Sequence, residues 1–266
     1  MPTLAPELRE WPAAPGDVQL MGVRFPTLDL DAAVTAVERL MATDELSHVV
    51  TVNLDYLAQI KRDPDLRATV TGADLAVADG VPLLWMARWS GQLLPGRVNG
   101  TDLMVRLLQI AGERGWPVAM LGGDPGVAEA AAVEAGRAWG TPIGGVWPLT
   151  RDEVVDAAGS HRIAAEVGAL GKPLVLVALG AGRQDDWIAK NRHLLGGGVV
   201  IGVGSALDFV AGTRSRAPRL FQRLGFEWLW RMLLEPRRLW RRYLVEDMPL
   251  LAGFAVSSVW ARMRGA

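Results

Sequence analysis

The chain has 266 residues, 50% of them hydrophobic, and a formal net charge of -1, so it can fold around a sizeable core and has no overall charge that would attract nucleic acid. It contains no cysteine, which excludes disulfides, thiolate catalysis and thiolate-bound zinc or iron–sulfur centres. Residues 1–17 are rich in proline and lack the basic and apolar segments of a signal peptide, so we expect them to form a flexible leader.

Hydrophobic periodicity predicts strands that alternate with helices from residue 18 onward. A first strand is expected at 18–25, and Asp29 or Asp31 is expected to cap the helix after it. The next predicted elements are a strand at 48–52, a helix at 54–67, a strand at 74–78 and helices at 82–89 and 103–115. Strand–turn–helix units follow at 117–135, 173–191 and 198–212, with a strand at 141–147 and a helix at 150–168 between the first two.

This order of elements predicts an α/β fold, a Rossmann-like parallel sheet with helices on both faces. The composition changes near Arg214, where alanine, glycine and valine give way to arginine, tryptophan and leucine. We therefore place a boundary between Gly212 and Pro218. An α/β catalytic domain is expected at 18–213 and a helical appendage at 214–266.

Glycine-rich turns at 122–123, 180–182 and 202–204 precede predicted helices, where free backbone N–H groups could hold a phosphate. None of these turns is a full GxGxxG, and no acidic residue follows at the spacing of a nicotinamide-binding fingerprint. A tight turn without a ligand therefore explains them as well as a dinucleotide site does.

Polar residues follow the predicted strands at the edge where ligands bind to open α/β sheets. Asp79 ends an apolar strand, where partial desolvation would suit its carboxylate to take a proton from an alcohol; a backbone bond in the turn to Val81 is the alternative. Thr51 and Asn53 point to one face and could bind a sugar, or could cap the backbone. Arg97 could pair with a phosphate or a carboxylate, or be solvated.

Two Asp-x-Asp sequences, at 29–31 and 63–65, have the spacing used by metal-dependent sugar transferases. Both stand where helices begin or are interrupted, so we interpret them as helix caps. His48, His161 and His193 lack the spacing of metal ligands, and no metal site is predicted.

The stretch 217–243 concentrates arginine and tryptophan, and only Glu227 and Glu235 oppose its charge. Such a surface suits a membrane-associating appendage that grips a lipid diphosphate or anionic headgroups; a basic helix with merely solvated arginines is the alternative. Pro236 is expected to kink or break the helix. The longest apolar run, 248–260, is about 13 residues, short of the roughly 18 that a membrane-spanning helix needs.

Several short sequence blocks, taken in their order and spacing, form a recognisable pattern. They are TVNLD at 51–55, ADG at 78–80, RVNGTDL at 97–103, MLGGDPGVAEAA at 120–131, GAGRQDDWI at 180–188, VGSALDFVAG at 203–212, RAP at 216–218 and GFEWLWRMLLEPRRLWRRY at 225–243. Together they resemble the WecG/TagA/CpsF family of bacterial glycosyltransferases over roughly residues 18–243. Residues 244–266 are expected to lie beyond the family's usual end and to form an extra interfacial helix.

The resemblance implies that a sugar, often of the N-acetylmannosamine type, moves with inversion from a UDP-sugar to a polyprenyl-diphosphate-linked acceptor, with no metal or cofactor. It implies a cytoplasmic protein that is peripheral on the inner face of the cell membrane, in cell-envelope or exopolysaccharide synthesis. Nucleic acid is not an expected partner, and a homo-oligomer is left open.

The resemblance also implies roles for individual residues. Asp79 would be the general base, and Thr51 and Asn53 would line the same pocket. Donor or acceptor binding is implied for Arg97 and Gln184. Stabilisation of the UDP leaving group and docking on the membrane are implied for the appendage arginines Arg231, Arg238 and Arg241.

The chain departs from the family pattern within this inferred sugar pocket. Members usually carry Pro-Lys-Gln-Glu at 182–185, where this chain has Gly-Arg-Gln-Asp, and often threonine or serine at Asn99. Val81-Pro82 replaces a more glycine-rich continuation. The donor sugar therefore stays open. A nicotinamide-dependent oxidoreductase on the same sheet and a non-catalytic membrane-docking module remain as alternatives.

Overall fold

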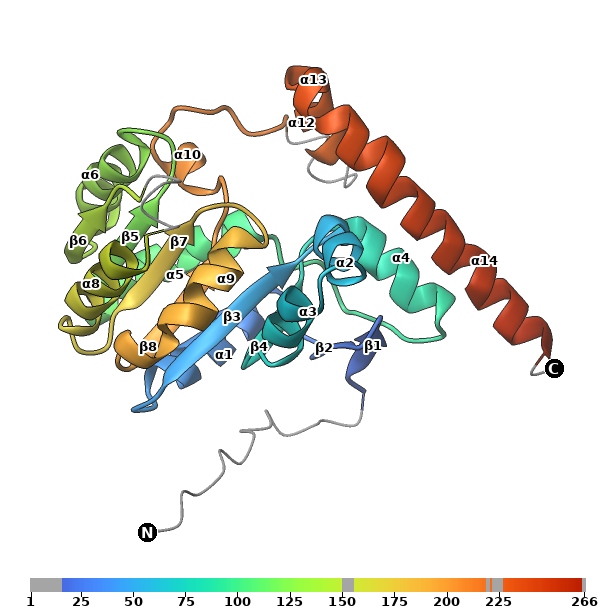
Figure 1. The fold of residues 1–266 in the computed structure, drawn as a ribbon, viewed down its shortest axis with the longest axis horizontal. Coiled ribbons are helices and arrows are strands. Elements are labelled where there is room, and N and C mark those ends of the chain that lie inside the picture. Colours follow the sequence, from blue (N-terminus) through green and yellow to red (C-terminus); the bar gives the residue numbers. More distant parts are fainter. Residues whose placement is uncertain (1–15, 150–155, 219–220, 222–226, 265–266) are drawn as a thin grey trace, which may run out of the picture.

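The computed structural model describes residues 16–149, 156–218, 221 and 227–264. These residues contain a six-stranded parallel sheet with the order β4-β3-β8-β7-β5-β6 (Figure 1). Its strands are β3 (Leu46–Val52), β4 (Leu75–Ala78), β5 (Val118–Gly122), β6 (Ile143–Trp147), β7 (Leu174–Ala178) and β8 (Gly198–Gly202). All residues of β3, β4, β5, β7 and β8 are buried, as expected for parallel strands covered on both faces. The predicted Rossmann-like α/β fold is confirmed.

Helices cover the two faces of the sheet, because alternate strand residues enter different apolar clusters. One face carries α1 (Leu30–Met41), α5 (Gly100–Arg114), α6 (Val127–Trp139) and α10 (Leu207–Val210). The other carries α2 (Leu54–Ile60), α3 (Pro64–Thr71), α4 (Val81–Trp89), α8 (Ala157–Gly168) and α9 (Arg183–Asn191), which leads into the short 3-10 helix η1 (Arg192–Leu194).

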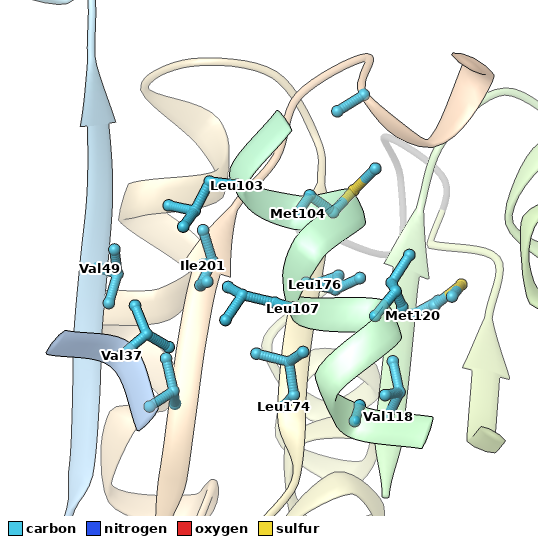
Figure 2. Packing of buried hydrophobic residues seen from close by; sticks show 14 of the residues in the cluster. Val37, Val49, Leu103, Met104, Leu107, Val118, Met120, Leu174, Leu176 and Ile201 are labelled. Atoms are coloured by element: carbon cyan, nitrogen blue, oxygen red, sulfur yellow. The ribbon is translucent and has the colours of Figure 1, made fainter. Parts of the chain in front are cut away.

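Helix α5 crosses the centre of the first face. Figure 2 shows its Leu103, Met104 and Leu107 over Ile201 of β8 and Leu176 of β7. These helix positions recur at the three- and four-residue spacing of a single apolar stripe. This packing fixes the N-terminus of α5 above the carboxyl end of the sheet.

The predicted single strand at 18–25 is wrong. The structure has an antiparallel hairpin of β1 (Val18–Leu20) and β2 (Val23–Phe25). Met21 and Gly22 between them have φ angles of 53° and 88°, the left-handed conformation of a two-residue hairpin turn. Methionine is not a turn residue in sequence patterns, which is why the run reads as one strand.

The predicted helix at 54–67 is also wrong, because it divides into α2 and α3. Asp63 accepts hydrogen bonds from the backbone N–H groups of Asp65 and Leu66, and Pro64 occupies the first turn. Asp29 likewise accepts from the N–H of Ala32 and caps α1. Both Asp-x-Asp sequences are helix caps, as predicted.

The chain after α10 continues into the appendage, which contains α12 (Glu227–Leu234), α13 (Pro236–Trp240), the π-helix η2 (Arg241–Asp247) and α14 (Met248–Arg264). The predicted break at Pro236 is confirmed. Helix α14 runs beside α4 (Figure 1), and its Leu251 is buried in the apolar cluster of β1, β2, α2 and α4. Within the described residues, no helix combines the length and the apolar character needed to cross a bilayer.

The wide turn of η2 lies directly before a proline. Pro249, one residue into α14, lacks an N–H donor, and its ring would clash with the carbonyl four residues earlier in a regular α-helix. The N–H of Met248 instead bonds to the carbonyl of Tyr243, five residues back. The π turn therefore absorbs the proline without breaking the long helix, and it sets which η2 side chains face the body.

Candidate active site

A cavity of about 590 Å³ lies at the carboxyl ends of β3, β4, β7 and β8. Strand-end residues Thr51, Asp79, Gly180 and Gly202 line it from the body, and residues of α12 and η2 line it from the appendage. The neighbouring strands β3 and β8 lead into α2 and α10 on opposite faces of the sheet. Ligands bind at such a divergence in open α/β sheets.

Asp79 directly follows β4 and is half-buried at the cavity. Its backbone N–H donates to the carbonyl of Val52 at 2.7 Å, which extends the pairing of β4 with β3 by one residue. Its carboxylate Oδ1 accepts from Asn99 Nδ2 at 3.2 Å. The position of the carboxylate is thus defined by the sheet below it and by an amide donor beside it.

The N-terminus of α5 packs closely against this carboxylate. A Cβ on Gly100 would lie 3.1 Å from Thr51 Oγ1 and 3.3 Å from Asp79 Oδ2, closer than most Cβ contacts, so a larger residue here would push against both side chains. Thr51 and Asp79 therefore meet under the start of α5. Asn53 has two roles, because its side chain caps α2 by accepting from the N–H of Tyr56 and also lines the cavity.

Gln184 belongs to a buried hydrogen-bond chain below the cavity. Its Nε2 donates to the hydroxyl of Tyr56 at 2.6 Å, and that hydroxyl donates to Asp185 at 2.9 Å. Its Oε1 accepts from the N–H of Gly204 at 3.0 Å, which fixes the loop after β8. A Cβ on Gly202 would collide with the amide of Gln184, so the glycine makes room for this chain.

Burial shifts the ionisation of this chain. It raises the pKa of Asp185 to about 6 and raises the pKa of Tyr56 well above its ordinary value. Burial, with the charge of Arg192, lowers the pKa of His48 to about 4, so its imidazole is neutral near pH 7. His48 Nε2 lies 3.9 Å from Asp185 Oδ1. Two members of this chain, Tyr56 and Gln184, line the cavity.

A second cluster joins the body to the appendage. Glu227, the first residue of α12, accepts from Arg97 Nη1 at 2.9 Å and from Asn99 Nδ2 at 3.3 Å. Its other oxygen lies 3.5 Å from Arg216 Nε. Arg216 is held in turn by Asp102 at 2.9 Å. Asn99 thus links the carboxylates of Asp79 and Glu227.

Two further arginines line the cavity in ion pairs. Arg214 pairs with Glu235 at 2.8 Å and with Asp208 at 3.1 Å. Arg242 of η2 pairs with Asp55 of α2 at 2.7 Å. The cations of the cavity therefore already have carboxylate partners from both the body and the appendage.

Asp247 of η2 lies beside the pair of Arg242 and Asp55. Burial and the negative charge of Asp55 raise the pKa of Asp247 to about 7, although Arg242 opposes this shift. Burial also raises the pKa of Asp55. Asp247 Oδ1 is buried and has no hydrogen-bond partner among the described residues. This wall of the cavity thus contains two carboxyl groups near one guanidinium, which is paired with Asp55.

No group of histidine, aspartate or glutamate side chains within the described ranges has the arrangement needed to hold a metal ion. The chemistry of the lining residues is instead that of carboxylates, guanidinium groups, amides and hydroxyls. Such groups can move a proton and neutralise an anionic oxygen.

The model of the Glycosyl transferase WecG/TagA/CpsF family matches residues 18–264. The chain belongs to this family. It is therefore a glycosyltransferase, and this membership favours the transferase over the oxidoreductase and the non-catalytic docking module. The expectation that residues 244–266 lie beyond the family's usual end is wrong, because the match includes all of α14. The WecG/TagA/CpsF unit thus comprises the sheet domain and the appendage helices together.

The family-implied residues fall into two groups in this WecG/TagA/CpsF structure. Those that line the cavity are Thr51, Asn53, Asp79, Arg97 and Gln184. Arg241 has an exposed side chain outside the lining, and the side chains of Arg231 and Arg238 lie outside the described part of the chain. The roles of the residues in both groups stay predictions.

Sequence reasoning assigned no role to several residues of this cavity. They are Tyr56, Arg214, Arg216, Glu227 and Asp247. Arg216 stands in the family block RAP, and Tyr56 directly follows the block TVNLD. Their places in or beside these family blocks are the sequence signal that could have pointed to them. Only the tertiary structure shows that both residues lie at the cavity.

Proposed function

We propose that the protein transfers a sugar, with inversion, from a UDP-sugar to a polyprenyl-diphosphate-linked acceptor on the inner face of the cell membrane, in cell-envelope or exopolysaccharide synthesis. The observation that carries the proposal is the half-buried carboxylate of Asp79, held by Asn99 at the edge of a cavity lined with arginines. An inverting displacement needs these two features, a base for the acceptor and cations for the leaving group.

On the acceptor side, the carboxylate of Asp79 takes the proton of the attacking hydroxyl. The hydroxyl oxygen then forms the new bond to the anomeric carbon while the bond from that carbon to the UDP oxygen breaks. Thr51 lies under the same helix start as Asp79, and Asn53 lines the cavity one residue beyond β3. Both are suited to hydrogen-bond sugar hydroxyls, and Gln184 is suited to the same task from the β7 side.

On the leaving-group side, guanidinium groups neutralise the charge that develops on the diphosphate. Arg97 lines the cavity, and it is proposed to bind donor or acceptor there. Arg231 and Arg238 of α12 and α13 are proposed to approach the diphosphate, and the exposed Arg241 is proposed to meet anionic headgroups. No metal or cofactor is part of the proposal.

The membrane part of the proposal rests on the exposed face of the appendage. Large apolar side chains there are more than half exposed, at Leu233, Leu234, Leu244, Val245, Val256, Val259, Trp260 and Met263. The last four recur at the three- and four-residue spacing of one helix stripe. Arg264 stacks over Trp260, an arrangement suited to the boundary between headgroups and acyl chains.

The experiment is a transfer assay with the full chain, a panel of UDP-sugars and a polyprenyl-diphosphate-linked sugar in vesicles. The expected result is transfer from one UDP-sugar, with the anomeric configuration of the product opposite to that of the donor by NMR. Retention of configuration would overturn the single-base mechanism, and no transfer from any UDP-sugar would overturn the donor class.

A further inference from the structure

Glu227 occupies a pocket of hydrogen-bond donors that suits an anion. Its carboxylate contacts Arg97 at 2.9 Å, Asn99 at 3.3 Å and Arg216 at 3.5 Å. All four residues line the cavity. Glu227 belongs to the appendage, whereas Arg97 and Asn99 belong to the body, so the appendage supplies the anion and the body supplies two of its donors.

The donors are held by contacts other than those to Glu227. Arg216 directs Nη2 to Asp102 at 2.9 Å and to Asn99 Oδ1 at 3.2 Å, which leaves its Nε edge toward Glu227. Asn99 Oδ1 also caps α5 by accepting from the N–H of Thr101 at 3.1 Å. The positive end of the dipole of this 15-residue helix lies at the same place and favours an anion.

A phosphate group makes the same kind of contact as a carboxylate with these donors, but with more oxygens and more charge. Guanidinium groups bind carboxylates and phosphates in equivalent geometry. The side chains of Glu227, Arg97 and Arg216 are 18%, 21% and 29% exposed and all three line the cavity, so a ligand in the cavity can reach their charged groups. A diphosphate that enters the cavity can therefore displace the carboxylate.

The pocket also lies next to the proposed base. Asn99 Nδ2 donates to Asp79 at 3.2 Å and to Glu227 at 3.3 Å, so a single amide group joins the two carboxylates. An anion bound in place of Glu227 would thus be adjacent to the reacting sugar. Both substrates of the proposed reaction have a diphosphate next to a sugar, the donor as UDP and the acceptor as the lipid diphosphate.

We infer that Arg97, Asn99 and Arg216 form a diphosphate-binding subsite, and that Glu227 is an internal stand-in which leaves this subsite when a substrate diphosphate binds. The inference rests on the proposed function, because it takes its ligand class from it. It adds a residue that opposes substrate binding, and it predicts that substrate binding releases α12 from the body at this contact.

The test measures diphosphate binding directly, by calorimetry with the full chain and two probes, UDP and farnesyl diphosphate. In Glu227→Gln and in Glu227→Ala the dissociation constant is expected to fall about three- to tenfold for the probe that uses the subsite, because its competitor is gone. Tightening of UDP alone assigns the subsite to the donor, and tightening of farnesyl diphosphate alone assigns it to the acceptor. Unchanged or weaker binding of both probes in both variants overturns the inference.

A matched control separates the subsite from a loosened appendage. Glu246 of η2 ties the appendage to Arg62 of α2 at 2.8 Å and does not line the cavity. Glu246→Gln is expected to leave both dissociation constants unchanged, and equal tightening in this variant would overturn the inference. Arg216→Gln is expected to weaken the same probe about tenfold or more.

The two proposals fail separately. If the protein transfers a UDP-sugar but loss of Glu227 tightens neither probe, the stand-in is refuted and the function holds. If loss of Glu227 tightens a diphosphate but no sugar is transferred, the subsite holds and the proposed reaction is refuted.

Discussion

Asn99 is the residue on which the geometry of the candidate site converges. Its Oδ1 accepts from the backbone N–H groups of Thr101 and Asp102, and its Nδ2 donates to the carboxylates of Asp79 and Glu227. The amide can therefore have only one orientation, since exchange of its oxygen and nitrogen would bring like groups together. One side chain thus sets the start of α5 and the position of the proposed base.

Replacement of Asp79 by asparagine tests the base at the residue scale. Asp79→Asn keeps the shape of the side chain but removes the proton acceptor, so kcat is expected to fall roughly 100- to 10,000-fold with little change in Tm. Steady-state transfer and thermal unfolding measure the two effects. Asp186→Asn is the matched control, because Asp186 is exposed on α9 and pairs with Lys190. Wild-type turnover in Asp79→Asn would refute the assigned base.

The raised pKa of Asp247 gives a second prediction at this scale. Because the folded-state pKa of about 7 lies above the ordinary value of 3.8, the stabilising contribution of this group is complete below about pH 4 and is lost as the pH rises through 7. Asp247→Asn removes this loss. Relative to wild type, the variant is expected to gain about 1–2 kcal/mol in unfolding free energy between pH 5 and pH 8, which allows for screening at the cavity wall.

Urea denaturation at the two pH values measures the effect of Asp247→Asn. Asp186→Asn serves again as the control and is expected to change the unfolding free energy by the same amount at both pH values. A difference between Asp247→Asn and wild type that does not depend on pH would show that the carboxyl group does not titrate in this window.

At the scale of elements, the apolar runs and glycine breaks were sufficient to predict the alternating strands and helices of the parallel sheet, but not the hairpin within 18–25 or the division of 54–67 into two helices. The parallel-sheet rule was sufficient to predict that Thr51 and Asp79 lie at the carboxyl-end edge of the sheet, whereas the pairing of their strands is seen only in the structure. Tyr56 and Arg216 could not be predicted, because their partners Gln184 and Asp102 lie more than 100 residues away in the chain. Helix α2 contains Tyr56, and the segment after α10 contains Arg216. Both residues take their places in the hydrogen-bond networks of the cavity only through these long-range contacts.

The appendage arginines show the same limit. The sequence presents a dense set of arginines, and an ordinary α-helical wheel does not distinguish Arg242, which lines the cavity, from Arg241, which does not. The π turn before Pro249 changes the helical register, and Arg242 lines the cavity while its neighbour Arg241 is exposed. A register that depends on a proline several residues later is not visible in local spacing.

Replacement of Pro249 tests the origin of this register. Alanine at this position supplies the missing N–H and removes the ring clash, so the wide turn of η2 is expected to contract to a regular α-helix. When the hydrogen bonds of the turn change from five-residue to four-residue spacing, the helix before the turn rotates by about one residue, or about 100°. This rotation is relative to α14, which Leu251 holds against the body. Pro249→Ala is therefore expected to lower kcat/KM about tenfold while the helix content by circular dichroism is retained.

The control for this element is Pro64→Ala at the start of α3, away from the cavity lining. It is expected to keep wild-type kcat/KM. Wild-type kcat/KM in Pro249→Ala as well would mean that tertiary contacts of η2, and not the proline, hold the π turn.

At the scale of the whole molecule, one appendage faces in two directions. Its inner side contributes Arg242, Tyr243 and Asp247 to the cavity, and Leu251 to the apolar cluster beside α4. Its outer side exposes an apolar stripe that includes Trp260. The candidate active-site cavity and the proposed membrane contact therefore lie on two sides of the same helical segment, and each side can be changed alone.

Two variants separate the proposed roles of this helical segment. Exchange of Val256, Trp260 and Met263 for glutamine removes the outer stripe, so binding to vesicles of phosphatidylethanolamine and phosphatidylglycerol is expected to weaken about tenfold or more. Turnover on a short-chain, water-soluble acceptor is expected to stay unchanged. Arg242→Gln changes the cavity wall instead, so it is expected to lower that turnover several-fold and to leave vesicle binding unchanged.

Co-sedimentation with vesicles and the soluble-acceptor assay, applied to both variants, give the four readings that decide this prediction. Val133→Gln on α6 is the control for the loss of an exposed apolar side chain elsewhere on the molecule, and it is expected to keep both properties. If Arg242→Gln kept full turnover on the soluble acceptor, η2 would be an anchor without a part in the reaction. If the outer-stripe variant lost turnover on the soluble acceptor to the same extent as vesicle binding, the two faces would not be independent. A change on the outer face would then alter the cavity by shifting the whole helical segment.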